Sequence, residues 1–288
     1  MISVIQAVII GLVQGLTELF PISSLGHSVI LPVVLGWHIN QNASNYLTFL
    51  VATHLATAIA LLLFFWGDWV KIVQGLIRSL KARGIDRDDT YAKLGWLLVV
   101  GTVPAGILGL LLQKELTKLF ASARVAAFFL IINGVVLFMA ERLHKRNKNK
   151  HSIDSQSDKR LAKTLSWSNS VGVGVIQSFA LIPGISRSGA SMAGGIFYGL
   201  NNEDAARFSF LLATPIIGAA ALLKIPQLFT SSMSSMRLAA IIGSIGAGIA
   251  AYLSVKFLVK YFQTKTLYPF AVYCIIAGIL VSLYLMIK

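Results

Sequence analysis

The sequence predicts an all-α integral membrane protein built from two related halves. Hydrophobic residues make up 56% of the 288 residues and charged residues only 12%, which is more apolar surface than a water-soluble domain of this length can bury. Apolar stretches of about 20 residues, the length that crosses a bilayer as a helix, recur along the chain. Polar motifs also repeat at a constant spacing. A bilayer is therefore the expected environment.

Six apolar segments are long enough to cross the membrane as helices and contain no interior charge cluster. Two further apolar stretches are too long for one crossing and are interrupted by the polar runs FPISSLGHS and IPGISRSGAS. Irregular backbone survives at membrane depth only where protein or water satisfies it. We therefore predict re-entrant helix–loop–helix hairpins at 2–36 and 166–200. The six spans are predicted at 46–67, 94–113, 122–141, 207–224, 237–256 and 267–287.

The two hairpins repeat each other at an offset of 163 residues, without a gap. Each half contains one hairpin and three spans, an odd number of crossings, so the second copy is predicted to be inverted relative to the first. We place the first half at 1–143, a polar, mobile linker at 144–165 and the second half at 166–288. The identical pairs are Gly11 and Gly174, Gln14 and Gln177, Ile22 and Ile185, Ser23 and Ser186, Gly26 and Gly189, and Ser28 and Ser191.

The basic residues predict the orientation in the membrane. Of the 25 Lys and Arg residues, 17 lie in the loop after the first span, in the linker and after the fifth span, which this topology places on one face. By the positive-inside rule that face is cytoplasmic, which leaves both termini and the first hairpin on the outside. The net charge of +14 follows from this arrangement, so we expect no nucleic-acid partner. The N-terminus lacks a basic segment before its apolar run, so we expect no cleaved signal peptide.

The first hairpin carries ionisable residues at membrane depth. Gln14 and Glu18 lie four residues apart on one helical face, Pro21 ends that helix, and Ser24 and His27 follow it. An ionisable residue inside a membrane segment is costly and marks a functional site by default. The alternative interpretation is structural: Glu18 bonded to backbone at the hairpin tip, and His27 a packed histidine.

The second hairpin has the composition of a phosphate-binding site. After the break at Pro183 and Gly184, residues Ser186, Arg187 and Ser188 open a new helix. Free N–H groups at a helix N-terminus, hydroxyl donors and a guanidinium together bind phosphate. No carboxylate lies within 15 residues of Arg187, so this buried cation needs an anion, either Glu18 or a bound phosphate. A purely structural Arg187–Glu18 pair is the alternative.

Two other polar positions are predicted to be structural. His54 lies within an apolar span and is interpreted as a packing or hydrogen-bonding residue, although it could border the site. Glu203 and Asp204 follow two asparagines and predict the start of a helix.

The segments QGLTELFPISSLGH and PGISRSGAS resemble the motifs of the undecaprenyl-diphosphate phosphatases, also called bacitracin-resistance proteins. The similarity covers essentially the whole chain. It implies a multi-pass enzyme of the bacterial plasma membrane that hydrolyses undecaprenyl diphosphate to undecaprenyl phosphate and inorganic phosphate. That reaction recycles the lipid carrier for peptidoglycan synthesis and confers resistance to bacitracin. The resemblance also implies a site facing the outside and a requirement for a divalent cation, Mg²⁺ or Ca²⁺.

The resemblance assigns roles to individual residues. Many members have Glu where this chain has Gln14, so Glu18 is left as the one carboxylate that could bind the cation. Members often have Thr where this chain has Leu25, so any role of that hydroxyl is absent here. The implied catalytic residues are Glu18, Ser24, His27 and Arg187, and the implied substrate-binding residues are Gln14, Ser23, Ser186, Ser188 and Ser191.

We expect phosphoanhydride hydrolysis dominated by charge stabilisation and positioning. Ser24 is the first choice of nucleophile, with Glu18 or His27 as its base, and direct attack by water is the second. The competing interpretation is a secondary transporter or lipid flippase built on the same inverted repeat; a lipid-binding scaffold is third. The oligomeric state stays open, with a homodimer among the alternatives.

Overall fold

Helices account for all regular secondary structure in the part of the chain that the computed structural model describes, residues 2–41, 43–119, 122–146, 157–230, 233–234 and 236–287. Within these residues, five helices are long and apolar enough to cross a membrane. The predicted class, an all-α membrane protein, is confirmed. The helices are α1 (Val4–Leu19), α2 (Ser24–Val34), α3 (Ser44–Phe64), α4 (Trp66–Lys81), α5 (Thr90–Leu119), α6 (Ala123–Arg146), α7 (Ser157–Thr164), α8 (Trp167–Ser178), the short 3₁₀ helix η2 (Phe179–Leu181), α9 (Arg187–Phe197), α10 (Asn202–Leu228), α11 (Arg237–Tyr261) and α12 (Tyr268–Ile287).

The five apolar helices are α3, α5, α6, α11 and α12, and the segments predicted as spans lie largely within them. The remaining predicted span, 207–224, lies within α10. This helix is 27 residues long and carries Glu203, Asp204 and Arg207 in its first two turns. Asn201 caps it by accepting a hydrogen bond from Asp204 N at 2.7 Å, as expected for a helix that starts in a polar environment.

Residues 66–81 differ from the prediction, which placed 66–67 at the end of a span and left 68–81 in a loop. They form α4, whose buried residues Ile72, Gly75 and Ser79 recur at helical spacing. A Cβ placed at Gly75 would lie 2.5 Å from Ala92 N, so α4 packs closely on the start of α5. A search for long apolar runs overlooks such a helix because its outer face is rich in Lys and Arg.

The linker predicted at 144–165 is helical at both described ends, where α6 continues to Arg146 and α7 begins at Ser157; residues 147–156 lie outside the described residues. Arg160 of α7 donates to Asp204 at 2.8 Å and to Glu203 at 2.6 Å. These ion pairs tie α7 to the first turn of α10. The predicted linker therefore contains a short helix paired with α10, and its mobility stays a prediction.

Each long apolar stretch at 2–36 and 166–200 forms two helices separated by a polar break. In the first, α1 ends at Leu19 before Pro21, and Ser23 caps α2 by accepting from Gly26 N at 3.1 Å. In the second, Gly184 adopts a φ of 101° that only glycine adopts without strain. Ser186 then caps α9 by accepting from Gly189 N at 3.1 Å. The two breaks are thus built by the same capping device.

The helix boundaries follow the offset found in the sequence. Helix α2 spans 24–34 and α9 spans 187–197, so both ends are 163 residues apart; the starts of α1 and α8, at 4 and 167, show the same offset. These boundaries support the repeat. The inverted orientation of the second copy stays a prediction.

Equivalent glycines make equivalent helix crossings in the two halves. A Cβ at Gly11 in α1 would lie 2.1 Å from Gly243 O in α11, and a Cβ at Gly174 in α8 would lie 2.3 Å from Gly101 O in α5. Small residues at such crossings let membrane helices approach closely. The first helix of each hairpin therefore packs against a long helix from the other half, and the halves are interlocked.

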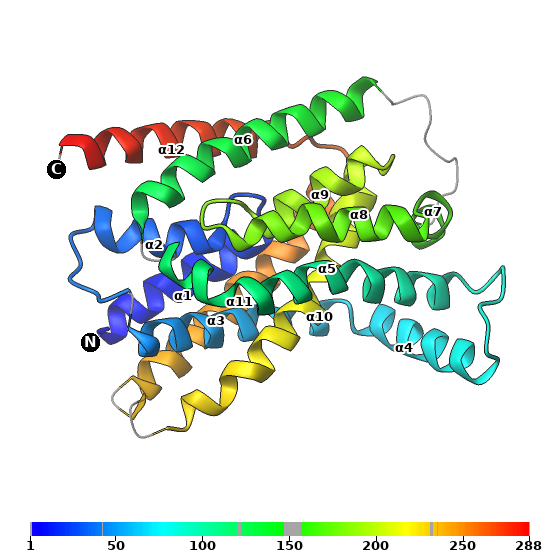
Figure 1. Ribbon diagram of the computed structural model, residues 1–288, viewed down its shortest axis with the longest axis horizontal. Coiled ribbons are helices and arrows are strands. Elements are labelled where there is room, and N and C mark those ends of the chain that lie inside the picture. Colours follow the sequence, from blue (N-terminus) through cyan, green and yellow to red (C-terminus); the bar gives the residue numbers. More distant parts are fainter. Residues whose placement is uncertain are drawn as a thin grey trace.

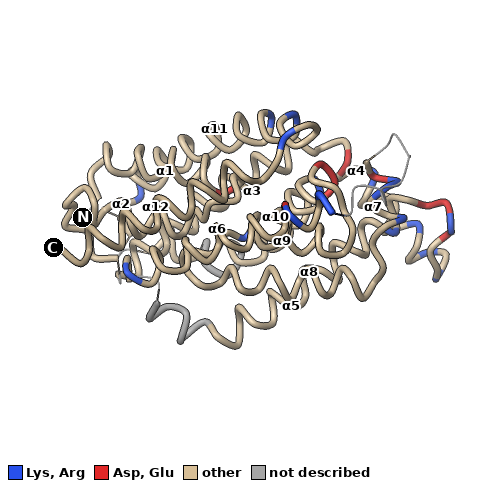
Figure 2. Tube along the Cα trace, turned by 90° about the horizontal axis from the view of Figure 1, so that it is seen from above, with Lys and Arg blue, Asp and Glu red and all other residues tan. Residues whose placement is uncertain are grey.

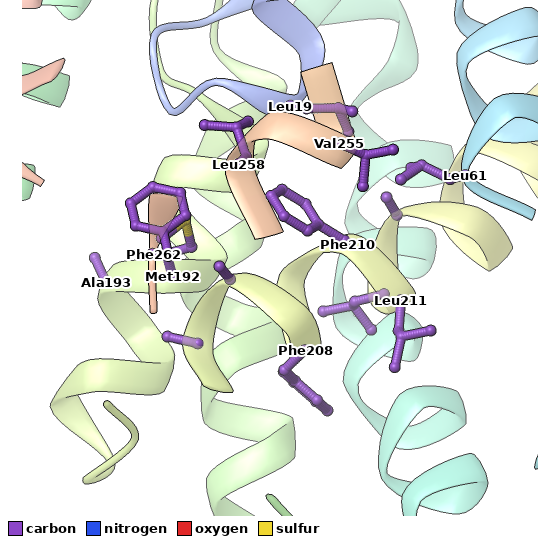
Figure 3. Close-up of a cluster of buried hydrophobic side chains, with 14 of the residues drawn as sticks. Leu19, Leu61, Met192, Ala193, Phe208, Phe210, Leu211, Val255, Leu258 and Phe262 are labelled. Carbon is purple, nitrogen blue, oxygen red and sulfur yellow. The ribbon is translucent and has the colours of Figure 1, made fainter. Parts of the chain in front are cut away.

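The arrangement positions the hairpins inside the bundle. Both termini lie at the same end, and α6 and α12 run along each other on one side (Figure 1). Lys and Arg gather mainly at the opposite end, around α4 and α7 (Figure 2). Figure 3 shows the core beside the first break, where Leu19 of α1 meets Val255 and Leu258 of α11 and Phe210 of α10. Because Leu19 follows Glu18, this packing fixes the backbone at the break.

Candidate active site at the hairpin tips

Glu18 is the centre of the polar cluster between the two hairpins. Glu18 is only 4% exposed, and both oxygens of its carboxylate accept hydrogen bonds. Arg187 donates to Oε1 through Nε and Nη2, each at 3.2 Å. Ser24 Oγ donates to Oε2 at 2.5 Å, and Gln14 Nε2 donates to Oε2 at 2.9 Å. The structure thus brings together four of the predicted site residues.

Ser24 and Arg187 reach Glu18 because each is the first residue of the second helix in its hairpin. The N-terminus of a helix carries partial positive charge and unpaired N–H groups. Two such termini, together with a guanidinium, meet at Glu18. This arrangement favours an anion at the tips.

Asn133 of α6 holds the two tips against each other. Its Nδ2 donates to Pro21 O at 2.9 Å, and its Oδ1 accepts from Ser186 N at 2.9 Å. The residue is 2% exposed. Ser188 Oγ adds a bond to Phe20 O at 3.2 Å. Asn133 was not predicted as a site residue; the signal available was a lone Asn inside an otherwise apolar span.

A cluster of hydroxyl groups lies behind Arg187. Ser191 Oγ and Ser209 Oγ are 2.7 Å apart, and Ser186 Oγ and Ser188 Oγ are 3.0 Å apart. The carbonyl of Ser209, in α10, accepts from Arg187 Nη1 at 3.3 Å. The Ser209 carbonyl thus binds the guanidinium nitrogen that does not bond Glu18. Ser209 is a further site residue that the sequence motifs did not single out.

The predicted substrate-binding serines do not all offer free hydroxyls. The hydroxyls of Ser23 and Ser186 cap α2 and α9, and that of Ser191 bonds Arg187 O at 2.8 Å. In this structure these hydroxyls bond backbone groups at the start of α2 and α9 and so stabilise the hairpin tips. Their predicted contact with substrate stays a prediction.

His27 lies on α2 but does not point at the carboxylate. Its Nδ1 is 2.7 Å from Ser23 O, and its Nε2 is 2.7 Å from the hydroxyl of Tyr273 in α12. The His27 and Tyr273 rings also stack, with centroids 5.8 Å apart. With both ring nitrogens engaged, His27 holds the hairpin tip and α12 together instead of contacting Glu18 in the described conformation.

His54 of α3 faces Glu18 instead. Its Nε2 is 3.4 Å from Glu18 Oε2, within ion-pair distance, and its Nδ1 is 2.8 Å from Leu50 O. The sequence analysis interpreted His54 as a packing or hydrogen-bonding residue that could border the site. In the structure its imidazole lies directly beside the Glu18 carboxylate.

The residues around Glu18 do not form a good binding site for a divalent cation. Among the described residues, no group of three or more His, Cys, Asp or Glu could hold a metal ion. Divalent cations bind through several oxygen ligands, whereas each oxygen of Glu18 already accepts from Arg187, Ser24 or Gln14. Gln14 Oε1 is buried and has no hydrogen-bond partner in the described part of the chain, which leaves one neutral oxygen beside the site.

A buried carboxylate that binds both a serine hydroxyl and an arginine at two helix N-termini is an arrangement that suits an anionic group. The fold and this polar cluster thus define a helical membrane protein with a candidate site for a phosphate-like group. The chain belongs to the family described as bacitracin resistance protein BacA, whose model matches residues 7–280.

Curated relatives align with this chain over nearly their whole length. An undecaprenyl-diphosphatase of Mycolicibacterium paratuberculosis is 45% identical, with 96% of this chain and 95% of the relative covered. An undecaprenyl-diphosphatase 2 of Frankia alni is 41% identical, with 96% of each chain covered. An undecaprenyl-diphosphatase of Granulibacter bethesdensis is 43% identical, with 96% and 94% covered.

Proposed function

We propose that the protein hydrolyses undecaprenyl diphosphate to undecaprenyl phosphate and inorganic phosphate. The observation that carries this proposal is the pairing of Ser24 Oγ and Arg187 with opposite oxygens of the buried Glu18. Membership of the family and the names of its relatives identify the substrate class. The released carrier lipid would serve envelope synthesis, and its turnover would confer resistance to bacitracin.

Arg187 and the two helix N-termini bind the diphosphate and stabilise the charge that develops on the terminal phosphoryl group. Ser24 Oγ attacks the terminal phosphorus, its proton passes to Glu18 Oε2, and the bond from phosphorus to the bridging oxygen breaks. Undecaprenyl phosphate leaves as the anion. Glu18 releases the proton taken from Ser24 to water. A water molecule then attacks the phosphoserine and gives a proton to Glu18, the bond from phosphorus to Ser24 Oγ breaks to free inorganic phosphate, and Glu18 returns that proton to Ser24 Oγ. Direct attack by water, with Glu18 as base, is the alternative.

A pure ion pair between Arg187 and Glu18 does not require a serine beside the carboxylate. Ser24 Oγ lies 2.5 Å from Oε2, which is the short distance of a hydroxyl bonded to an ionised acceptor. This contact favours the enzyme over a transporter or flippase, for which binding groups without a nucleophile suffice. His27 remains in the proposal as a second base, provided that its ring leaves Tyr273 when substrate binds.

In this proposal the divalent cation binds together with the diphosphate of the substrate. Mg²⁺ commonly binds through substrate phosphates and keeps several waters, so it needs few protein ligands. Such a cation would neutralise charge on the phosphates, with Gln14 Oε1 as the free protein oxygen nearby. Glu18 would then be left to take up protons.

The hairpin tips are proposed to open toward the outside of the plasma membrane, with the basic end of the bundle in the cytoplasm. The gathering of Lys and Arg at the end away from both termini supports this orientation (Figure 2). Cys274 is buried, so introduced cysteines can report sidedness. A cysteine at Arg237 should react with an impermeant thiol reagent in intact cells, and one at Lys81 should not.

The proposed activity is tested by phosphate release from a polyprenyl diphosphate by the purified protein in detergent. Ser24→Ala, Glu18→Ala and Arg187→Ala should each lose at least about 100-fold in rate. Ser282→Ala and Arg237→Ala are matched controls, because Ser282 bonds Gly278 O within α12 and Arg237 bonds Leu228 O and Thr230 O at the end of α10. Full activity in Arg187→Ala would refute the site.

The homodimer is a separate question. Light scattering of the same preparation decides whether the protein is a homodimer.

A further inference from the structure

His54 occupies the remaining side of the Glu18 carboxylate. It lies in the middle of α3, its side chain is 24% exposed, and its Nε2 is 3.4 Å from Glu18 Oε2. Oε2 is also the oxygen that accepts from Ser24 Oγ. Arg187 binds Oε1 instead. The imidazole therefore faces the oxygen that would receive the proton, not the one that pairs with the arginine.

The environment of the ring determines where it carries hydrogen. Nδ1 is 2.8 Å from Leu50 O, and a carbonyl can only accept, so Nδ1 carries a hydrogen. Glu18 Oε2, opposite Nε2, is an acceptor as well. Both ring nitrogens thus face acceptors, and Nε2 donates to Oε2 in the form of the ring that carries hydrogen on both nitrogens, the imidazolium. At 3.4 Å that contact is longer than a typical hydrogen bond, as is common for catalytic contacts before substrate binds.

The internal repeat provides a comparison within the same chain. At the offset of the hairpins, 163, the equivalent of Glu18 is Leu181; at the offset of 161 that aligns residues 50–62 with 211–223, the equivalent of His54 is Pro215. The half that lacks the carboxylate also lacks the imidazole. Gln14, by contrast, is matched by Gln177. The histidine therefore accompanies the carboxylate, whereas the glutamine belongs to the common framework.

We propose that His54 is a positioning residue of the phosphatase site: its Nε2–H holds Glu18 in the rotamer that presents Oε2 to Ser24 and Oε1 to Arg187. The role depends on a hydrogen-bond donor at this point of α3, and it rests on the proposed function of the site. His54 faces the oxygen of Glu18 that would take up the proton, and it acts on the reaction through the orientation of that carboxylate. A misplacement of about 1 Å at a catalytic group can cost on the order of 100-fold in rate.

The test compares His54→Leu with His54→Gln in the detergent assay of phosphate release. Leu fills the space without a donor, and Gln can place an amide N–H near the position of Nε2. We expect His54→Leu to lower kcat by about 10- to 100-fold with KM within about threefold, because Arg187 still binds the diphosphate. His54→Gln should recover most of the lost kcat. His38→Leu, at an exposed histidine outside the site, should match the wild type.

Two outcomes would overturn the assignment: wild-type kcat in His54→Leu, or a loss in His54→Gln as large as in His54→Leu. Thermal unfolding of both variants in detergent separates misfolding from misplacement, because a positioning role predicts lower kcat at an unchanged melting temperature. An inactive wild-type protein would instead count against the proposed function itself. The two failures are therefore distinguishable.

Discussion

Ser24 and Arg187 occupy equivalent places in the two halves of the chain, and both bind Glu18. Each is the first residue of the second helix of its hairpin, 163 residues apart. Ser24 Oγ lies 2.5 Å from Glu18 Oε2, and Arg187 Nη2 lies 3.2 Å from Oε1. One repeated structural position therefore supplies the nucleophile candidate in one half and the phosphate-binding cation in the other. The two hairpins differ at this position and also at Glu18, whose equivalent is Leu181, so the repeated framework carries an asymmetric site.

Arg187→Lys should not restore the activity that Arg187→Ala loses. A lysine presents one ammonium and cannot donate to Glu18 from two nitrogens while also reaching Ser209 O. We expect at least about a tenfold loss in kcat/KM for phosphate release. A lysine variant with wild-type kcat/KM would show that charge alone matters at this position.

Asn133→Leu should destabilise the protein and lower its activity together. The substitution removes the Asn133 partner of the buried Ser186 N and leaves Pro21 O with the weak, long contact from Cys274 Sγ at 3.9 Å. A buried polar group without a partner costs about 1–3 kcal/mol. Thermal unfolding in detergent should therefore show a clearly lower melting temperature. Asn169→Ala, near the start of α8 and away from the tips, is the control. An unchanged melting temperature in Asn133→Leu would mean that the tips hold together without this clamp.

Gly11→Ala should destabilise the crossing of α1 and α11, because the added Cβ would lie 2.1 Å from Gly243 O. Overpacking of this kind costs about 1–3 kcal/mol. Gly106→Ala in α5 is a matched control, because nothing lies within 4 Å of its Cβ, and Ala favours a helix more than Gly does. The melting temperature should fall in the first variant and stay equal or rise in the second. The reverse order would contradict the interlocked packing.

His27→Ala should lower the rate through the backbone beside Ser24. Ser23 has a φ of 69°, a conformation that costs a residue other than glycine about 1–3 kcal/mol. The bonds from Gly26 N to Ser23 Oγ and from His27 Nδ1 to Ser23 O hold it in place. We expect at least about a tenfold loss in kcat. Ser23→Gly in the same background should recover part of it, since glycine adopts this φ without strain; no recovery would favour a direct role for His27.

Calorimetric titration tests the proposed place of the divalent cation. If it accompanies the diphosphate, Mg²⁺ or Ca²⁺ should show no saturable binding to the protein alone up to about millimolar concentration. Binding should appear with a diphosphate lipid present, and chelation should lower activity reversibly. Tight binding without the lipid, lost in Glu18→Gln, would establish a resident metal site instead.

The sequence predicts the parts of this site that interrupt an apolar pattern. Glu18, Ser24 and Arg187 stand out because polar residues beside Pro or Gly break long apolar stretches, and burying them is costly. His54, Asn133 and Ser209 do not stand out, because each lies singly in a continuous helix and its role depends on which helices meet in three dimensions. The same reason explains His27: helical spacing places it one turn from Ser24, but packing against α12 turns its ring to Tyr273. Residues in α4 were missed because their pattern is amphipathic instead of apolar.

The central claim is that Glu18, Ser24 and Arg187 surround one diphosphate group inside the membrane. An experimental structure with a non-hydrolysable, methylene-bridged polyprenyl diphosphate tests it most directly. The predicted result places the terminal phosphate about 3 Å from the Arg187 guanidinium and within reach of Ser24 Oγ. Density for the phosphates elsewhere in the protein, with the Arg187–Glu18 pair intact and no ligand beside it, would contradict the account.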